Sequence, residues 1–280
     1  MSTAQAREFE FTAADFERVR KLIHEHAGIA LSGAKQDMVY SRLARRLRAV
    51  GDKTFAQYLA RLERGDRREW ETFINALTTN LTSFFREAHH FETLARHLAA
   101  LGGRRPLRIW CSAASTGEEP YSIAMTAVDA FNSFTPPVAI LASDLDTSVL
   151  AQGEAGIYPQ ERVDKLPRET VARFFLKGAN AQAGMVRVRP ELQRLISFKR
   201  INLLDAHWPV EAPLDAIFCR NVMIYFASEL QSTLWDRFSA KLNDDGMIYI
   251  GHSERVIGPA AGVLNIEGPT AYRKKVRAAA

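Results

Sequence analysis

Residues 107–125 read LRIWCSAASTGEEPYSIAM, and this stretch decides the fold. The apolar run LRIWCSA predicts a buried strand, and the small residues after it predict a tight turn around Gly117. Apolar residues at helical spacing then indicate a helix that carries Tyr121, Ala124, Met125 and Val128. Small side chains let a ligand approach the backbone closely, so the turn is a candidate cofactor loop. Because the turn does not match G-x-G-x-x-G, a plain turn is an equally good interpretation.

Four further apolar runs extend this pattern toward the C-terminus. They are VAILASD from residue 138, LISFKRINL from 195, LDAIFCRN from 214 and GMIYIGH from 246. Short, near-continuous apolar strands that alternate with helices are typical of a parallel sheet covered on both faces, so an α/β, Rossmann-like fold is predicted. Ligands of such sheets bind beyond the carboxyl ends of the strands. Cys111 and Cys219 lie inside apolar runs, which implies neither a disulfide framework nor a metal site.

The N-terminal part of the chain has a different period. From Thr12 to about Leu81 apolar residues recur at helical spacing, which predicts a small all-helical domain. We expect this domain over residues 1–88 and the sheet domain over 89–280, with an inserted β-subdomain at about 156–191, where prolines and glycines break the rhythm. Helix caps and ends are predicted at Thr12 with Asp15, and at Gly28, Gly51 and Asp66.

Composition narrows the range of functions. The 280 residues carry a net charge of +5, which favours an acidic partner such as a protein surface, an anionic membrane or nucleic acid. The 47% hydrophobic and 25% charged fractions are close to those of soluble globular proteins. No apolar run is long enough to cross a bilayer, and the N-terminus lacks the apolar core of a signal peptide. We therefore expect a cytoplasmic protein.

Acidic residues after the first two strands indicate which cofactor the loop would hold. Glu118 and Glu119 open the helix after the turn, where a phosphate group would be repelled. S-adenosylmethionine has no phosphate, and a carboxylate favours its ammonium and sulfonium groups. Asp144 ends the second strand and is placed to accept hydrogen bonds from both ribose hydroxyls, whereas Asp146 is assigned to the cap of the next helix. The alternative is that either aspartate only caps that helix.

Four segments together resemble a known family. TTNLTSFFRE at 78–87, CSAASTGEEPYS at 111–122, ASDLD at 142–146 and DAIFCRNVMIYF at 215–226 are similar to the signature segments of CheR-type chemotaxis methyltransferases, in that family's order and spacing. The resemblance covers nearly the whole chain. It implies that S-adenosylmethionine methylates glutamate side chains of bacterial chemoreceptors, leaving S-adenosylhomocysteine. It also implies the residues that border the cofactor: Asn80, Thr82, Arg86, Glu118, Asp144, Asn202, Leu203, Arg220 and Asn221.

Several of these implied roles have a physical basis. Arg86 can pair with the methionyl carboxylate and Glu118 with the ammonium, while Asn202 and Leu203 can reach the adenine. Without the resemblance, a surface salt bridge for Arg86 and a turn role for Asn202 would be the better interpretations. A glutamate acceptor has an ordinary pKa of about 4.3 and needs no general base. Tyr225 is a candidate to orient the acceptor, or equally an aromatic residue packed at the start of a helix.

Two basic segments are candidates for contact with the receptor. The helix predicted at about 36–50 carries Arg42, Arg45 and Arg46 on one side, and in the family the corresponding helix is thought to face the acidic methylation helices of the receptor. In a subgroup of the family, a strand and loop bounded by two glycines binds a tether peptide from the receptor C-terminus. The segment 177–189 fits that subgroup, with Arg187 and Arg189 as peptide contacts, or else forms an ordinary hairpin.

Other functions have less support in the sequence. GHSE at 251–254 lacks the second glycine of a nucleophile elbow, and the histidines have no metal-ligand spacing, so no metal is expected. A nucleic-acid methyltransferase would fit the basic charge, but an Asn-Pro-Pro-Tyr motif is absent after the fourth strand, so no nucleic-acid partner is expected. A cofactor-binding module without activity would be expected to lose Glu118, Asp144 or Asn221, which are all present.

Overall fold

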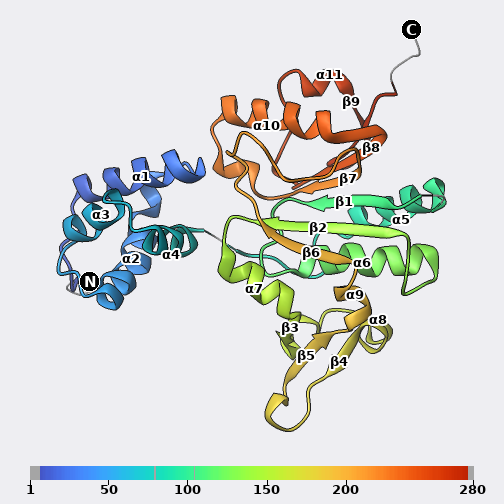
Figure 1. Cartoon of the computed structure of the whole chain (residues 1–280), viewed down its shortest axis with the longest axis horizontal. Coiled ribbons are helices and arrows are strands. Elements are labelled where there is room, and N and C mark those ends of the chain that lie inside the picture. The colour runs from blue at the N-terminus through green and yellow to red at the C-terminus, as the bar shows by residue number, and fades with distance from the viewer. Residues whose placement is uncertain (1–6, 79, 104, 277–280) are drawn as a thin grey trace, which may run out of the picture. The chain divides into compact units, whose positions relative to one another are not determined.

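The computed structural model describes residues 7–78, 80–103 and 105–276, which form two compact units (Figure 1). The first unit contains residues up to 78 together with Tyr225–Ala227, and the second contains the rest from Asn80 onward. Residues 80–88 thus group with the sheet, although the sequence places them in the helical domain. The reason is packing, because Phe84 is buried in the core of the second unit.

The first unit is built from four α-helices, and its local signals were predictable. Thr12 and Asp15 form the predicted capping box, Gly28 and Gly51 end helices with φ of 69° and 77°, and Asp66 accepts from the backbone of Glu69. These four predictions are therefore confirmed. The helices are α1 (Ala13–Ala27), α2 (Gln36–Val50), α3 (Phe55–Glu63) and α4 (Arg67–Leu77). Their buried faces include Val19, Ile23, Leu43, Leu47, Tyr58, Leu62 and Phe73.

The second unit contains a seven-stranded sheet in the order β6-β2-β1-β7-β8-β10-β9. The first five strands in that order are parallel, as predicted, and β10 is antiparallel to both neighbours. The C-terminal hairpin of β9 and β10 was not predicted, because its strands are short and Ile266 is largely exposed. The strands are β1 (Leu107–Cys111), β2 (Val138–Asp144), β6 (Ile196–Arg200), β7 (Leu214–Cys219), β8 (Leu242–Ile250), β9 (Leu264–Gly268) and β10 (Ala271–Lys274).

Helices cover both faces of this sheet (Figure 1). On one face, Ile109 and Cys111 join a core with helices α5 and α6. On the other face, the ring centroid of Trp110 lies 5.1 Å from that of Phe238 on α10. This alternation along β1 explains why the strand is apolar throughout. Outside the insertion described below, the α-helices of the unit's described residues are α5 (His89–Leu101), α6 (Glu118–Phe131), α7 (Thr147–Ala155), α10 (Ser228–Lys241) and α11 (Ala260–Val263).

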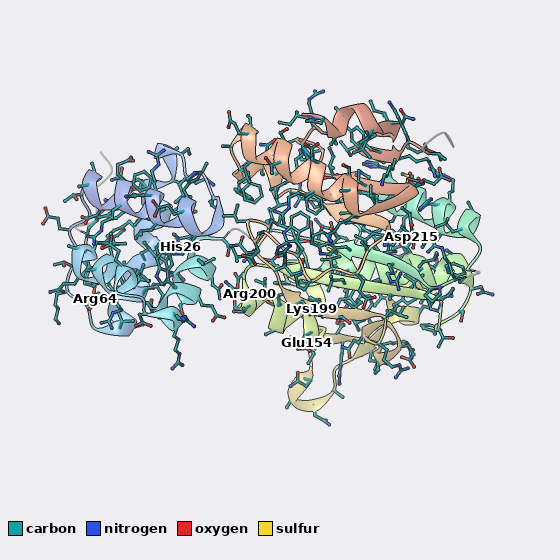
Figure 2. All side chains as sticks on the ribbon, turned by 45° about the horizontal axis from the view of Figure 1, so that its top comes forward. His26, Arg64, Glu154, Lys199, Arg200 and Asp215 are labelled. Carbon is teal, nitrogen blue, oxygen red and sulfur yellow. The ribbon has the colours of Figure 1, made fainter. Side chains whose placement is uncertain are left out.

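Polar residues mark the two ends of the sheet. Asp215, at the amino end of β7, is buried and accepts from the Arg105 guanidinium at 3.0 Å and from the Arg108 backbone at 2.8 Å. Arg200 lies toward the opposite, carboxyl end, on β6 (Figure 2). Asp215 therefore ties β1 to β7 at the end of the sheet remote from the predicted ligand edge.

The insertion after α7 forms a separate three-stranded antiparallel sheet in the order β3-β5-β4. Its elements are β3 (Ile157–Pro159), the 3-10 helix Gln160–Arg162, α8 (Arg168–Phe174), β4 (Phe175–Lys177), β5 (Met185–Val188) and α9 (Pro190–Gln193). The sequence predicts an edge strand at 185–189 that is free to pair with a guest peptide. That prediction is wrong, because β5 is the central strand and has a partner on both sides.

Candidate active site

The loop after β1 is shaped by a glycine and by a carboxylate. Gly117 has φ of 97°, and a Cβ there would lie 2.8 Å from both Gly153 Cα and Tyr158 Oη, so only glycine fits. Ser115 is also left-handed, with φ of 48°, and its backbone N–H donates to Asp144 Oδ2 at 2.8 Å. The loop is therefore fastened to the carboxyl end of β2.

Asp144 has the geometry expected of a ribose-binding residue. It lies at the end of β2 and accepts two backbone N–H groups, from Ser115 at 2.8 Å and from Asp146 at 3.0 Å. The residue as a whole is partly exposed, but its carboxyl is enclosed, and this burial raises the pKa of Asp144 to about 6. Asp146 caps α7, as predicted, and also accepts from Asn80 Nδ2 at 2.9 Å.

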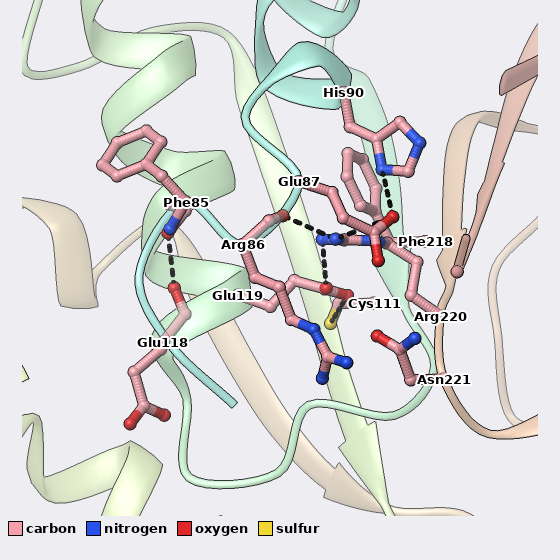
Figure 3. Close-up of polar contacts among 12 residues, drawn as sticks. Phe85, Arg86, Glu87, His90, Cys111, Glu118, Glu119, Phe218, Arg220 and Asn221 are labelled. Atoms are coloured by element: carbon pink, nitrogen blue, oxygen red, sulfur yellow. Dashed lines mark hydrogen bonds and ion pairs between the residues drawn. The ribbon is translucent and has the colours of Figure 1, made fainter. Parts of the chain in front are cut away.

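The adjacent acids Glu118 and Glu119 point in different directions (Figure 3). Glu118 is fully buried and pairs with Arg162 of the inserted subdomain, and it accepts from Thr116 Oγ1 at 2.6 Å. Glu119 instead faces Arg220 Nη1 at 2.7 Å. Burial raises the pKa of Glu119, against the opposing effect of Arg220. The sequence analysis named both acids but assigned a cofactor contact to Glu118 alone, and it missed Arg162.

Arg220 is a buried cation that holds three segments together. Besides Glu119, its guanidinium lies 3.4 Å from Glu87 Oε2 and donates to the Arg86 carbonyl at 2.5 Å. Burial opposes ionisation of Glu87, but Arg220 and His252 outweigh it and keep the pKa of Glu87 below its ordinary value. These contacts fix segment 86–87 against α6 and the end of β7, so Arg220 is a structural neighbour of the site as well as a predicted cofactor contact.

Arg86 supplies a guanidinium with spare donors. Its Nη1 donates to the Leu81 carbonyl at 3.0 Å, and within the described ranges no carboxylate forms an ion pair with it. Figure 3 shows the Arg86 side chain directed toward the same space as Glu119 and Asn221. Of the five donors of a guanidinium, most remain able to bind a carboxylate here. Thr82 lies in the same segment, and its carbonyl accepts from Arg162 at 3.3 Å.

Asn202 and Leu203 follow β6 and form a turn. Asn202 Oδ1 accepts from the Leu204 backbone at 3.0 Å, and the Asn202 carbonyl accepts from Asp205 at 3.0 Å. The Leu203 side chain is buried, and its carbonyl accepts from Arg237 at 3.0 Å. The turn role of Asn202 is thus evident in the structure, and the predicted adenine contact rests on the position of the turn at the carboxyl end of the sheet.

Asn221 depends on a residue that the sequence analysis did not select. Asn221 follows β7 with φ of 57°, and its backbone N–H donates to the buried carboxylate of Glu254 at 2.9 Å. Glu254 belongs to the GHSE segment, considered in the sequence only as a hydrolase motif. Its signal in the sequence was weak, because Glu254 lies four residues beyond the end of β8 at Ile250, whereas Asp144 is the last residue of β2.

The three arginines predicted to contact the receptor differ in whether they already form contacts within the helical unit. Arg46 forms a two-point ion pair with buried Glu69, at 2.9 and 3.1 Å, and Arg42 donates to the carbonyls of Ala76 and Thr78. Arg45 is exposed and pairs with no residue in the described part of the chain. The basic side of α2 is therefore mostly engaged within the helical unit, which leaves Arg45 as the available cation.

Three other predicted contacts lie elsewhere. Tyr225 groups with the helical unit, where its carbonyl accepts from Ala30 at 2.8 Å. Arg187 is exposed on β5, and Arg189 lines a cavity of about 340 Å³ together with Phe134, Arg173 and Glu191. Arg187 and Arg189 thus belong to the inserted subdomain and not to the group formed by Arg86, Glu119, Arg220 and Asn221.

A possible cation position near this group is better explained by an internal ion pair. Among the described residues, Glu87, His89 and His90 each offer a ligand atom within 4.8 Å of the others. Burial lowers the pKa of His90 to about 3, so this imidazole is neutral at physiological pH. Arg220 already places its positive charge 3.4 Å from Glu87, which opposes a second cation there.

Comparison with known proteins agrees with this geometry. A Rossmann-like unit whose cofactor loop carries acidic residues suits a cofactor without phosphate groups. This arrangement is that of an S-adenosylmethionine-dependent methyltransferase. Residues 14–78 match the all-alpha domain of CheR methyltransferases, and residues 80–271 match their SAM-binding domain. The chain therefore belongs to the CheR methyltransferase family and is an S-adenosylmethionine-dependent methyltransferase of chemotaxis.

Individual relatives match along most of their length. Chemotaxis protein methyltransferase 2 of Pseudomonas aeruginosa is 50% identical over 268 residues, which covers 95% of both chains. The chemotaxis protein methyltransferase of Salmonella typhimurium is 46% identical, covering 92% of this chain and 89% of the relative. That of Escherichia coli is 48% identical, covering 86% and 84%. The resemblance inferred from four motifs is thereby confirmed.

Proposed function

We propose that this enzyme methylates glutamate side chains on the acidic helices of chemoreceptors, in the cytoplasm, and reaches the membrane only through those receptors. The observation that carries the proposal is the group at the carboxyl ends of the strands, in which Arg86 has spare donors beside Glu119 and Asn221. The residues fit S-adenosylmethionine, because Arg86 can bind its carboxylate and Asp144 its ribose, and no cluster of cations for phosphates is needed.

Of the two adjacent acids, Glu119 has the better position for the cofactor ammonium. It points into the same space as Arg86, whereas Glu118 is directed to Arg162 (Figure 3). The raised pKa of Glu119 reflects a buried carboxyl that is incompletely compensated by Arg220. A further cation beside it would favour its ionised form. Glu118 then supports the loop through Thr116 and Arg162.

The chemistry requires placement more than proton transfer. When bound, S-adenosylmethionine supplies an electrophilic methyl group. The acceptor carboxylate is already ionised, so transfer would need no base on the enzyme: the methyl carbon would bond to the carboxylate oxygen, and the sulfur would leave as the neutral thioether of S-adenosylhomocysteine. Orientation alone contributes about 7–11 kcal/mol in favourable cases. The thiols do not compete as nucleophiles, because burial raises the pKa of both Cys111 and Cys219.

The helical unit is the proposed receptor contact, with Arg45 on α2 as its available cation. The net charge of +5 supports an acidic partner. Tyr225, grouped with this unit, remains the candidate to orient the acceptor carboxylate. A receptor tail would pair with an outer strand of the inserted sheet, and β4 is better suited than β3 because Pro159 in β3 lacks an N–H.

Labelled cofactor tests this function. The enzyme is incubated with methyl-labelled S-adenosylmethionine and receptor-containing membranes, and the labelled receptor is then treated with mild base. A carboxyl methyl ester releases its label as volatile methanol, and a receptor whose candidate glutamates are replaced by alanine serves as the control. Label that resists base, or that appears equally on the control receptor, contradicts glutamate methylation.

A further inference from the structure

The ends of β7 and β8 are joined by one buried carboxylate. Glu254 Oε2 accepts from the backbone N–H groups of Asn221 at 2.9 Å and Gly251 at 2.6 Å. Its Oε1 accepts from Val222 at 2.9 Å and Met223 at 2.8 Å. All four donors belong to the segments that follow neighbouring parallel strands, Cys219 being paired with Ile250 at their ends. Glu254 therefore satisfies the backbone of the edge where ligands of such sheets bind.

These contacts hold Asn221 in a conformation that most residues avoid. Its φ of 57° is left-handed, which asparagine tolerates better than most side chains but does not adopt without support. The Asn221 amide also lies against Gly251, since a Cβ on Gly251 would come 2.3 Å from Asn221 Nδ2. The direction of the Asn221 side chain is thus set from one side by Glu254 and from the other by the missing side chain of Gly251.

We propose that Glu254 is a positioning residue of the methyl-transfer site, which acts by fixing residues 221–223 so that Asn221 faces the cofactor. This inference rests on the proposed placement of Asn221 beside the cofactor. Glu254 itself is buried, and both of its carboxylate oxygens accept hydrogen bonds from backbone N–H groups. In this proposal it contacts neither the cofactor nor the acceptor. The glutamate of the GHSE segment, Glu254, is thus assigned a positioning role.

The four backbone donors require an acceptor at both oxygens of residue 254. Glutamine has the same shape, but its NH₂ group would face two backbone N–H donors where the carboxylate has an acceptor oxygen. A buried N–H group without an acceptor lowers stability. Glu254→Gln should therefore release either the Asn221 and Gly251 pair or the Val222 and Met223 pair. Either release lets residue 221 leave the left-handed region, so the site should lose affinity for the cofactor.

The experiment is a double-mutant cycle measured by calorimetric titration with S-adenosylhomocysteine. Its variants are Glu254→Gln, Asn221→Gly and the two combined, because glycine accepts φ of 57° and removes only the side chain. We expect Glu254→Gln to weaken binding about tenfold in the wild-type background and less than about twofold in the Asn221→Gly background. Glu267→Gln, a matched change at an exposed ion pair on β9, should bind as the wild type does.

Kinetics separate positioning from a loss of folded protein. Misfolding lowers the apparent kcat and leaves both KM values unchanged, whereas positioning raises the KM for S-adenosylmethionine and leaves the KM for receptor unchanged. If Glu254→Gln does not fold, Gly251→Ala displaces the Asn221 amide from the other side and should give the same rise in KM.

The outcomes distinguish this inference from the proposed function. If Asn221→Gly binds S-adenosylhomocysteine as tightly as the wild type does, the proposed placement of Asn221 fails, and the inference fails with it. If Asn221→Gly weakens binding but folded Glu254→Gln does not, only the inference is overturned. Equal losses from Glu254→Gln in both backgrounds also overturn it, because Glu254 would then act independently of Asn221.

Discussion

Asp144 has a raised pKa, and its proposed ribose contact predicts that ligand binding depends on pH. Burial raises the pKa of this carboxyl to about 6 in the free protein, although two backbone N–H groups favour its ionised form. Ribose hydroxyls would donate more strongly to the ionised form than to the protonated form, so binding should lower this pKa and release protons. Affinity should then be full above pH 6 and fall as the pH drops through 6.

The test at this position uses Asp144→Asn. Titrations with S-adenosylhomocysteine between pH 5 and 8 should show wild-type affinity falling as the pH drops through about 6, where the carboxyl becomes protonated. The asparagine variant should bind more weakly at pH 7, by roughly 1.5–3 kcal/mol for hydrogen bonds to a charged acceptor, and should lack this pH dependence. An identical pH profile in both proteins would remove Asp144 from the ribose site.

At the residue scale, the sequence could locate positions but could not determine directions. Glu118 and Glu119 share the first turn of α6, and successive helical residues point about 100° apart, so only the packed structure shows which of them faces Arg220 and which faces Arg162. Arg162 and Glu254 were missed for the same reason. Their partners are distant in sequence, and each partner atom is defined only after the strands are paired.

At the scale of elements, helix α2 carries both structural and available arginines. Arg46 pairs with a buried glutamate, whereas Arg45 is exposed. A joint charge reversal of Arg42, Arg45 and Arg46 would therefore mix receptor contact with stability, because breaking a buried pair costs about 3–5 kcal/mol. The single substitutions separate the two effects.

We expect Arg45→Glu to lower the rate of receptor methylation at low salt several-fold while leaving thermal stability and S-adenosylhomocysteine affinity unchanged. Arg46→Glu should instead lower the melting temperature of the helical unit, because it places two acids together beside Tyr58 Oη, which donates to Glu69 at 2.8 Å. Methylation rates, calorimetric scans and titrations measure these effects. Wild-type methylation by Arg45→Glu would mean that Arg45 is only a solvated side chain.

Strand β4 is the proposed template for a receptor tail. The backbone N–H of Arg189 donates to the Phe174 carbonyl at 3.0 Å, and the backbone N–H of Gly178 donates to the Met185 carbonyl at 2.9 Å. Because successive N–H groups of a strand point to opposite sides, the Lys177 N–H is directed away from β5. Lys177→Pro removes that donor, and Lys177→Ala keeps it. Titration with C-terminal receptor peptides should show binding lost in the proline variant only. Equal binding by both variants would exclude this edge of β4.

Periodicity predicted the elements of the fold well, but it did not predict strand order. The caps of α1 and α4 and the five parallel strands follow from local signals. The central place of β5 does not, because alternation of Val186 and Val188 with Arg187 only indicates that one side is buried. The pairing partners of a strand depend on tertiary packing.

At the scale of the whole molecule, the family models match both units. Among the residues described, no helix is long and apolar enough to span a bilayer. The matches to residues 14–78 and 80–271 meet where the two units divide. This agreement supports the proposal that residues 80–88 belong functionally to the cofactor site, with Arg86 among them.

The most direct test of the central claim is a crystal structure of the enzyme with S-adenosylhomocysteine bound. We expect the ribose hydroxyls on Asp144, the amino-acid carboxylate on Arg86 and the ammonium nearer to Glu119 than to Glu118. A ligand bound away from the carboxyl ends of β1, β2 and β7, or one whose carboxylate is held by a residue other than Arg86, would contradict the account.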